Sequence, residues 1–389
     1  MCSSDLLLYR AIARMDRLRI RHLAVLDGEG RPLGMLTTRG LLRVRAGGTL
    51  AIGDAVETAP DARTLRAAHD RLPGLATALL EEKIPASDVA IAISAITRDI
   101  TARAARLAER AMADTGAGPP PGPWCLLVLG SAGRGESLLA PDQDNALIVA
   151  DQAADAVDGW FAAWGERIND ILNEAGIPYC KGGVMAGKRA FRRSVGEWRA
   201  QTERWIAVPD GEALLNVDIF FDAVPVAGDR ALAAAVLDPA RARASDAPAF
   251  LRQMAEGVTA HRPPLGLFGR LKLDGGRLDL KRGGLLPIVS GARIMALKLG
   301  SAAAATADRL RAAAAAGRLA PDNAEALLQA RETVAETILR QQIADIATGA
   351  APGSRVDPAR LGRAERTRLK QALREAGEIA TLVQDVLTA

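Results

Sequence analysis

The chain has 389 residues, of which 49% are hydrophobic and 25% are charged, as in ordinary globular proteins. At roughly 100–200 residues per domain, this length predicts two or three domains. Lysine and arginine outnumber aspartate and glutamate by only 50 to 46, and aromatic residues make up 3%. So small a charge excess argues against a protein that coats nucleic acid or a membrane, and so few aromatic residues argue against base-stacking platforms.

Cysteines and histidines are too few and too scattered for a disulfide framework, a thiolate zinc site or a histidine metal site. The chain has three of each, namely Cys2, Cys125 and Cys180, and His22, His69 and His261. No apolar run approaches the roughly 20 residues that span a bilayer, and the N-terminus lacks the pattern of a signal peptide. We therefore expect a cytoplasmic protein without a membrane partner.

The first 56 residues predict a small α/β unit. Residues 22–27 and 33–36 have the pattern of short strands joined by a turn at 28–30, and a helix is expected to begin near Arg39. The stretch RIRHLAVLDGEGRPLGMLTTRGLL resembles the second half of a CBS repeat. CBS repeats bind adenosine nucleotides in pairs. Only one partial copy is found here, so both a ligand site and a structural remnant remain open.

Residues 61–112 are predicted to be helical because apolar residues recur there every three or four positions. They are Val89, Ile93, Ile96, Ile100, Ala104, Leu107 and Ala111. Residues 115–123 contain three consecutive prolines between glycines and predict a linker or an exposed loop.

Strands and helices alternate in the next segment. Apolar runs predict strands over 125–129, 146–149 and 214–221, and a helix is expected to end at Gly176. After residue 246 the pattern is mainly helical, apart from a hairpin candidate over 271–280 that turns at 274–276. The sequence thus predicts an α/β (α+β) fold followed by a helical C-terminal region.

A Gly-Ser turn directly follows the strand predicted over 125–129. The segment 129–136 has neither the Gly-Lys-Ser/Thr ending of a P-loop nor the G-x-G-x-x-G pattern of a dinucleotide site. Gly130, Ser131 and Arg134 instead suit phosphate oxygens, through close backbone approach, a hydroxyl donor and a planar guanidinium. Lys181, in a Lys-Gly-Gly segment, is a further candidate for phosphate, with a plain loop as the alternative. The basic clusters at 189–193 and 281–282 are interpreted as solvated surface or as contacts for phosphates or an acidic partner.

Asp142 and Asp144 point to the same face if their segment is extended, although Pro-Asp-Gln-Asp-Asn is also good turn chemistry. Asp218 and Asp222 share one face of the strand predicted over 214–221, and either can supply a third carboxylate. Two such charges ~4 Å apart at an effective dielectric of ~20 repel by about 4 kcal/mol. The cluster therefore predicts a hard divalent cation, Mg²⁺ or Mn²⁺, as cofactor.

Together these motifs resemble the DNA-polymerase-β-like nucleotidyltransferases. In particular, they are similar to the CBS-domain-associated nucleotidyltransferase family, which is akin to the N-terminal domain of the uridylyltransferase that modifies the PII protein. Four segments carry this resemblance: GSAGRGESLLAPDQDNALI, GIPYCKGGVMAGKRAFRRSVGEWR, LLNVDIFFD and PPLGLFGRLKLDGGRLDLKRGGLLPIV.

The resemblance implies a polymerase-β-like core with a mixed sheet, in three parts. A partial CBS-like unit spans 1–56. A nucleotidyltransferase domain spans 57–232, with a helical lead-in to about 113, the linker at 115–123 and a catalytic core at 124–232. A helical substrate-binding domain spans 233–389.

The activity implied is Mg²⁺-dependent transfer of a nucleoside monophosphate from ATP or UTP to a hydroxyl of a protein or small molecule, in signalling. Asp142, Asp144 and Asp218 would be catalytic and hold the metal, with Asp222 as the alternative third ligand. Gly130, Ser131, Arg134 and Lys181 would bind the nucleotide. Nucleic acid is not an expected partner, and a homodimer remains open. The alternative function is a non-catalytic, nucleotide-sensing regulatory protein.

Overall fold

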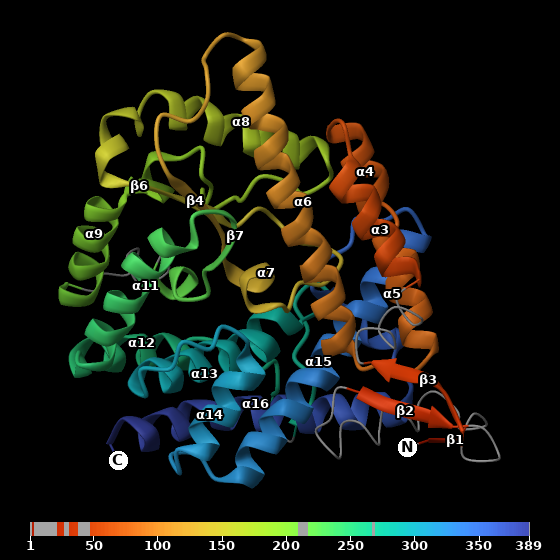
Figure 1. The fold of residues 1–389 in the computed structure, drawn as a ribbon. Helices are drawn as coiled ribbons and strands as arrows, with labels where there is room; N and C mark the ends of the chain where they lie inside the picture. The colour runs from red at the N-terminus through yellow and green to blue at the C-terminus, as the bar shows by residue number, and fades with distance from the viewer. Residues whose placement is uncertain are drawn as a thin grey trace. The chain divides into compact units, whose positions relative to one another are not determined.

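The computed structural model describes residues 2–3, 22–26, 31–37, 47–208, 217–266 and 269–388, and Figure 1 colours them along the chain. The chain divides into two compact units, Met1–Ala55 and Val56–Ala389. Within the described ranges, no helix combines the length and the apolar character needed to cross a bilayer.

The N-terminal unit contains a three-stranded sheet of β1 (Cys2–Ser3), β2 (His22–Leu26) and β3 (Pro32–Thr37). β1 runs parallel to β2, and β2 runs antiparallel to β3 with a register shift between Val25 and Leu26. The two predicted strands are confirmed. The turn expected at 28–30 and the helix expected near Arg39 lie outside the described residues. Helix α3 (Gly47–Thr58) leads into the second unit.

The second unit contains a four-stranded mixed sheet in the order β6-β5-β4-β7. Strand β4 (Trp124–Val128) pairs antiparallel with β5 (Asn145–Val149) and with β7 (Val224–Gly228), while β5 pairs parallel with β6 (Arg192–Ser194). All five residues of β5 are buried, as its unbroken apolar run predicts. The predicted strands over 125–129 and 146–149 and the predicted mixed α/β fold are thus confirmed.

Helices make up most of the rest of this unit. Before the sheet and within it are α4 (Ala62–His69), α5 (Leu72–Glu81), α6 (Ala86–Asp114), α7 (Gly130–Arg134), α8 (Trp160–Glu174), α9 (Val195–Ala207) and α11 (Arg230–Ser245). The C-terminal helices are α12 (Pro248–Thr259), α13 (Leu286–Lys298), α14 (Thr306–Ala315), α15 (Pro321–Ala347) and α16 (Arg363–Thr388). Figure 1 shows α13 to α16 gathered on the side of the sheet on which α7 lies. The predicted helical C-terminal region is confirmed.

The strand predicted over 214–221 is wrong where the structure describes it. Residues 217–220 form a helical turn, in which the Phe221 amide donates to the Val217 carbonyl at 3.2 Å. The reason lies in packing, because Phe220 and Phe221 are both fully buried and each packs against a different aromatic side chain. Phe220 stacks on Trp198 at 4.8 Å, and Phe221 packs toward Phe250.

The hairpin predicted over 271–280 is only partly correct. Its turn forms, since the Asp274 amide donates to the Arg277 carbonyl at 2.9 Å across Gly275 and Gly276, which both have positive φ. The following strand β8 (Leu278–Asp279), however, pairs with β9 (Arg355–Val356). Leu278 and Val356 are both buried, so the C-terminal core determines the partner of this strand.

Candidate functional site

Helix α7 is a single short turn that follows β4 directly and carries the Gly-Ser motif. Gly130 has φ +59°, and a Cβ there would lie 2.4 Å from Asp144 Oδ2. A Cβ at Gly133 would lie 2.2 Å from the backbone carbonyl oxygen of Asp222. Glycine is therefore required at both positions, because any side chain would push α7 away from the acidic segment or from the helical turn.

Acidic and amide residues alternate in the segment 142–145, and the two kinds of side chain take opposite faces of it. Gln143 and Asn145 are buried and share Asn169, whose Nδ2 donates to Gln143 Oε1 at 2.8 Å and to Asn145 Oδ1 at 3.1 Å. Asp142 and Asp144 consequently take the other face of an extended segment, as the spacing predicts. The buried amides fix the direction of the two carboxylates.

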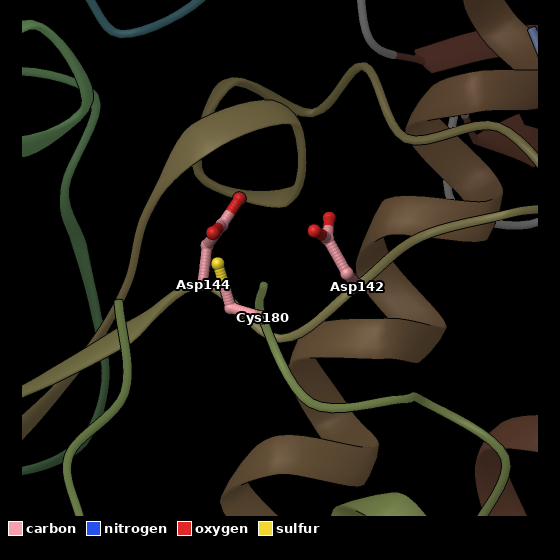
Figure 2. Close-up of side chains that lie close together, drawn as sticks. All are labelled: Asp142, Asp144 and Cys180. Atoms are coloured by element: carbon pink, nitrogen blue, oxygen red, sulfur yellow. The ribbon is translucent and has the colours of Figure 1, made fainter. Parts of the chain in front are cut away.

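Asp142 and Asp144 gather with Cys180, and their ligand atoms all lie within 4.8 Å of one another. Figure 2 shows Asp144 and Cys180 side by side, with the Asp142 carboxylate facing them. Backbone pairing brings the cysteine here: the Gln143 amide donates to the Pro178 carbonyl at 2.9 Å and the Asn145 amide to the Val184 carbonyl at 3.1 Å. Cys180 was not predicted as a site residue, because nothing along the chain links it to the acidic pair. Lys181 follows it and is exposed.

The electrostatics of this group favour a cation. Burial, and then the charge of Asp142, raise the pKa of Asp144 to about 7, although a hydrogen bond from Cys180 acts in the opposite direction. Burial also raises the pKa of the Cys180 thiol, and both aspartates add to that shift. Two carboxylates match the hard divalent ions Mg²⁺ and Mn²⁺, and a thiol tolerates the softer of the two. The side chains present therefore fit such an ion.

The two candidates for a third carboxylate have different surroundings. Asp222 is fully buried, and its two oxygens accept from Arg134 at 2.5 Å, from Arg293 at 3.0 and 2.6 Å and from Arg309 at 2.8 Å. Burial alone would raise the pKa of Asp222, but the three guanidinium groups hold it well below its usual range. Its oxygens are thus occupied by arginines. Asp218 is one-third exposed and lies 2.8 Å from Arg293 Nη1.

The phosphate candidates on α7 also differ from one another. Ser131 is partly exposed, with its hydroxyl 3.1 Å from that of Ser137. Arg134 is buried between Glu136, at 2.8 Å, and Asp222. The Arg134 guanidinium therefore ties α7 to the segment that follows the helical turn at 217–220. The Ser131 hydroxyl is more accessible to a ligand than this guanidinium.

A cavity of about 270 Å³ borders this group. Its wall includes Ser131, Arg134 and Asp142 from the α/β part, and Lys281 and Arg331 from the C-terminal region. The basic cluster at 281–282 was predicted as solvated surface or as contacts for phosphates or an acidic partner, whereas Arg331 was not predicted. Arg331 lies within the regular polar and apolar pattern of α15, so no local signal distinguishes it.

A small mixed sheet, a Gly-Ser turn beside an Asp-x-Asp pair and a helical C-terminal region define a nucleotidyltransferase type of protein. The family described as "Putative nucleotidyltransferase DUF294" matches residues 70–212, and the family described as "Putative nucleotidyltransferase substrate binding domain" matches 248–386. These two matches cover more than half of the chain, which belongs to this nucleotidyltransferase family. A CBS domain matches residues 1–47. No curated protein matches the chain with significance.

Proposed function

We propose that the protein is a divalent-metal-dependent nucleotidyltransferase that moves a nucleoside monophosphate from a nucleoside triphosphate to a hydroxyl group. The observation that carries this proposal is the convergence of Asp142 and Asp144 within 4.8 Å, next to the Gly-Ser turn of α7. Family membership supports the same reaction class. The signalling uridylyltransferases that the chain resembles make a protein hydroxyl the first acceptor to test, with ATP and UTP as the first donors.

Asp142 and Asp144 would hold Mg²⁺ or Mn²⁺, which neutralises the phosphates and activates the α-phosphorus when bound. Gly130 lets the nucleotide approach the backbone, and Ser131 donates a hydrogen bond to a phosphate oxygen. We assign proton acceptance from the hydroxyl to Asp218. As the new oxygen–phosphorus bond forms, the bond between the α-phosphorus and the bridging oxygen breaks, and pyrophosphate leaves with the electron pair.

The test is pyrophosphate release from each of ATP, UTP, GTP and CTP with Mg²⁺ or Mn²⁺, over a panel of protein and small-molecule acceptors. Asp144→Asn should lower the rate by about two orders of magnitude or more, because a metal contributes several kcal/mol and each 1.36 kcal/mol is tenfold. Asp308→Asn is the matched control, since Asp308 is exposed and pairs with the equally exposed Arg311. Unchanged release by Asp144→Asn would contradict the proposal.

The CBS match over residues 1–47 favours a second candidate, a nucleotide sensor that binds without transfer. Calorimetry of the full chain with ATP, AMP and UTP separates the two functions. Binding that requires no divalent ion and survives Asp142→Asn, together with no pyrophosphate release, would support the sensor.

A further inference from the structure

The cavity beside α7 contains a buried arginine whose hydrogen-bonding capacity is not used. The Arg331 side chain is only 10% exposed, and its Nε has no hydrogen-bond partner. Its one ion-pair contact among the described residues is from Nη1 to Glu136 Oε1 at 3.8 Å, which is too long for a hydrogen bond.

The neighbouring acids do not account for this arginine. Glu136 Oε2 accepts from Arg134 at 2.8 Å, and Glu136 Oε1 accepts from the Thr306 amide at 2.8 Å. Asp88 is close enough to feel the charge of Arg331, yet no hydrogen bond joins them. A buried guanidinium with an unpaired N–H is costly unless a ligand completes it.

The positively charged side chains around the cavity favour an anion as its ligand. Lys281 is exposed on the π-turn Lys281–Leu285 and borders the same cavity, where its charge also reaches Asp144. The acids in its wall are Glu136, which already accepts from Arg134 and Thr306, and Asp142, which the proposed function gives to the metal. Arg331 and Lys281 thus supply positive charge next to the position of the metal.

The size and position of the cavity narrow the choice of anion. A volume of about 270 Å³ is below the roughly 300–1,000 Å³ of pockets that enclose whole drug-sized ligands, so it holds part of a nucleotide. Ser131 and Asp142, to which the proposed function gives a phosphate oxygen and the metal, also line this cavity. We propose that Arg331 and Lys281 bind the β- and γ-phosphates of the nucleoside triphosphate. This inference rests on the proposed function and adds donor recognition by the C-terminal helices.

The experiment is isothermal titration calorimetry of the full chain with inorganic tripolyphosphate and Mg²⁺, and with each nucleoside triphosphate and its monophosphate. Arg331→Gln should weaken tripolyphosphate and triphosphate binding at least tenfold and change monophosphate binding less than twofold. Arg340→Gln is the matched control, because Arg340 lies on the same helix, is exposed and pairs with Glu336. Wild-type affinity of Arg331→Gln for tripolyphosphate, or equal losses for triphosphate and monophosphate, would overturn the inference.

Two further measurements keep the result interpretable. Arg331→Met should leave the Tm of the ligand-free protein unchanged or higher, because it removes a buried guanidinium whose Nε has no hydrogen-bond partner. A lower Tm with unchanged tripolyphosphate affinity would show a structural role. Lys281→Gln, at an exposed position, should weaken tripolyphosphate binding severalfold even if the Arg331 variants do not fold.

The failure of this inference and the failure of the proposed function give different results. If the wild type binds tripolyphosphate through Arg331 but releases no pyrophosphate from any triphosphate, the proposed function fails while the anion site stands. If Arg331→Gln catalyses transfer with an unchanged KM, the anion site fails while the proposed function stands.

Discussion

Asp144 is the residue on which the candidate site depends most. Its carboxylate lies between Gly130, Asp142 and Cys180, and burial with the neighbouring charge raises its pKa to about 7. A carboxylate with a raised pKa destabilises the folded protein once it ionises. The ionised carboxylates of Asp142 and Asp144 therefore repel each other, and a bound cation relieves this repulsion.

This repulsion predicts how stability depends on pH. Between about pH 4 and pH 7 the folded protein keeps the Asp144 proton that the unfolded chain has lost, so the free energy of unfolding falls as pH rises through this window. Mg²⁺ needs the ionised form and should raise the Tm by several degrees more at about pH 8 than at about pH 5.5. Thermal unfolding with Mg²⁺ and with EDTA measures both effects.

The Asp144→Asn variant tests whether Asp144, and not another titrating group, causes this pH dependence of stability. In EDTA at about pH 8 it should raise the free energy of unfolding by on the order of 2 kcal/mol, because one pKa unit corresponds to 1.36 kcal/mol and the side chain is partly solvated. It should also abolish the pH-dependent Mg²⁺ effect. A variant that keeps the wild-type Tm gain from Mg²⁺ at about pH 8 would show that the ion binds elsewhere.

At the scale of single elements, α7 joins the sheet to the acidic residues. Arg98 on α6 donates to the carbonyls of Ala132 and Gly133 at 2.7 Å each, and Arg134, the last residue of α7, pairs with Asp222. A helix this short has little stability of its own, so these contacts and the two glycines keep it in place.

Gly133→Ala tests that packing. The new Cβ would meet the Asp222 carbonyl oxygen at 2.2 Å, and that backbone cannot yield easily, so we expect a loss of about 1–3 kcal/mol of stability together with a lower transfer rate. Gly74→Ala, in helix α5, is the control because nothing lies within 4 Å of its Cβ position, and it should stabilise by about 0.4–1 kcal/mol. Chemical denaturation compares the two variants. Equal stability of Gly133→Ala and wild type would show that α7 is free to shift.

At the scale of the whole second unit, Asp222 connects the α/β part to the C-terminal helices. Arg134 comes from α7, Arg293 from α13 and Arg309 from α14, and all three donate to this one buried carboxylate. Arg293 also lies close to Asp218, so one arginine contacts both the proposed base and the connecting carboxylate of Asp222. The sheet and the C-terminal helices should therefore unfold together.

Asp222→Asn should destabilise the protein by about 3–5 kcal/mol, because it removes the charge of the buried carboxylate that three buried arginines share. Since the pKa of Asp222 is depressed, its contribution is present above about pH 4 and is lost as pH falls below that value, so the variant should lose less stability on acidification than the wild type. Urea unfolding at several pH values measures both. The control Asp308→Asn should change stability by less than about 1 kcal/mol, because Asp308 and its partner Arg311 form an exposed ion pair. A similarly small effect at Asp222 would contradict the connecting role.

Local patterns in the chain were sufficient to predict much of this protein. The apolar runs predict β4 and β5, the stripe from Val89 predicts α6, and Gly176 ends α8 with φ +94°. The alternation in 142–145 predicts that Asp142 and Asp144 share a face. These features depend on neighbours within a few residues, so backbone periodicity alone specifies them.

Only the tertiary structure decided which distant side chains meet. Phe220 and Phe221 became a helical turn because both had to be buried against Trp198 and Phe250. Cys180 joined the acidic pair through backbone hydrogen bonds of Gln143 to Pro178 and of Asn145 to Val184. Arg331 reached the cavity from a position 200 residues after Ser131. Asp222 and Asp218 look alike in sequence, but three arginines from separate helices surround the first and one reaches the second. Such contacts arise from packing between elements, and no spacing along the chain encodes them.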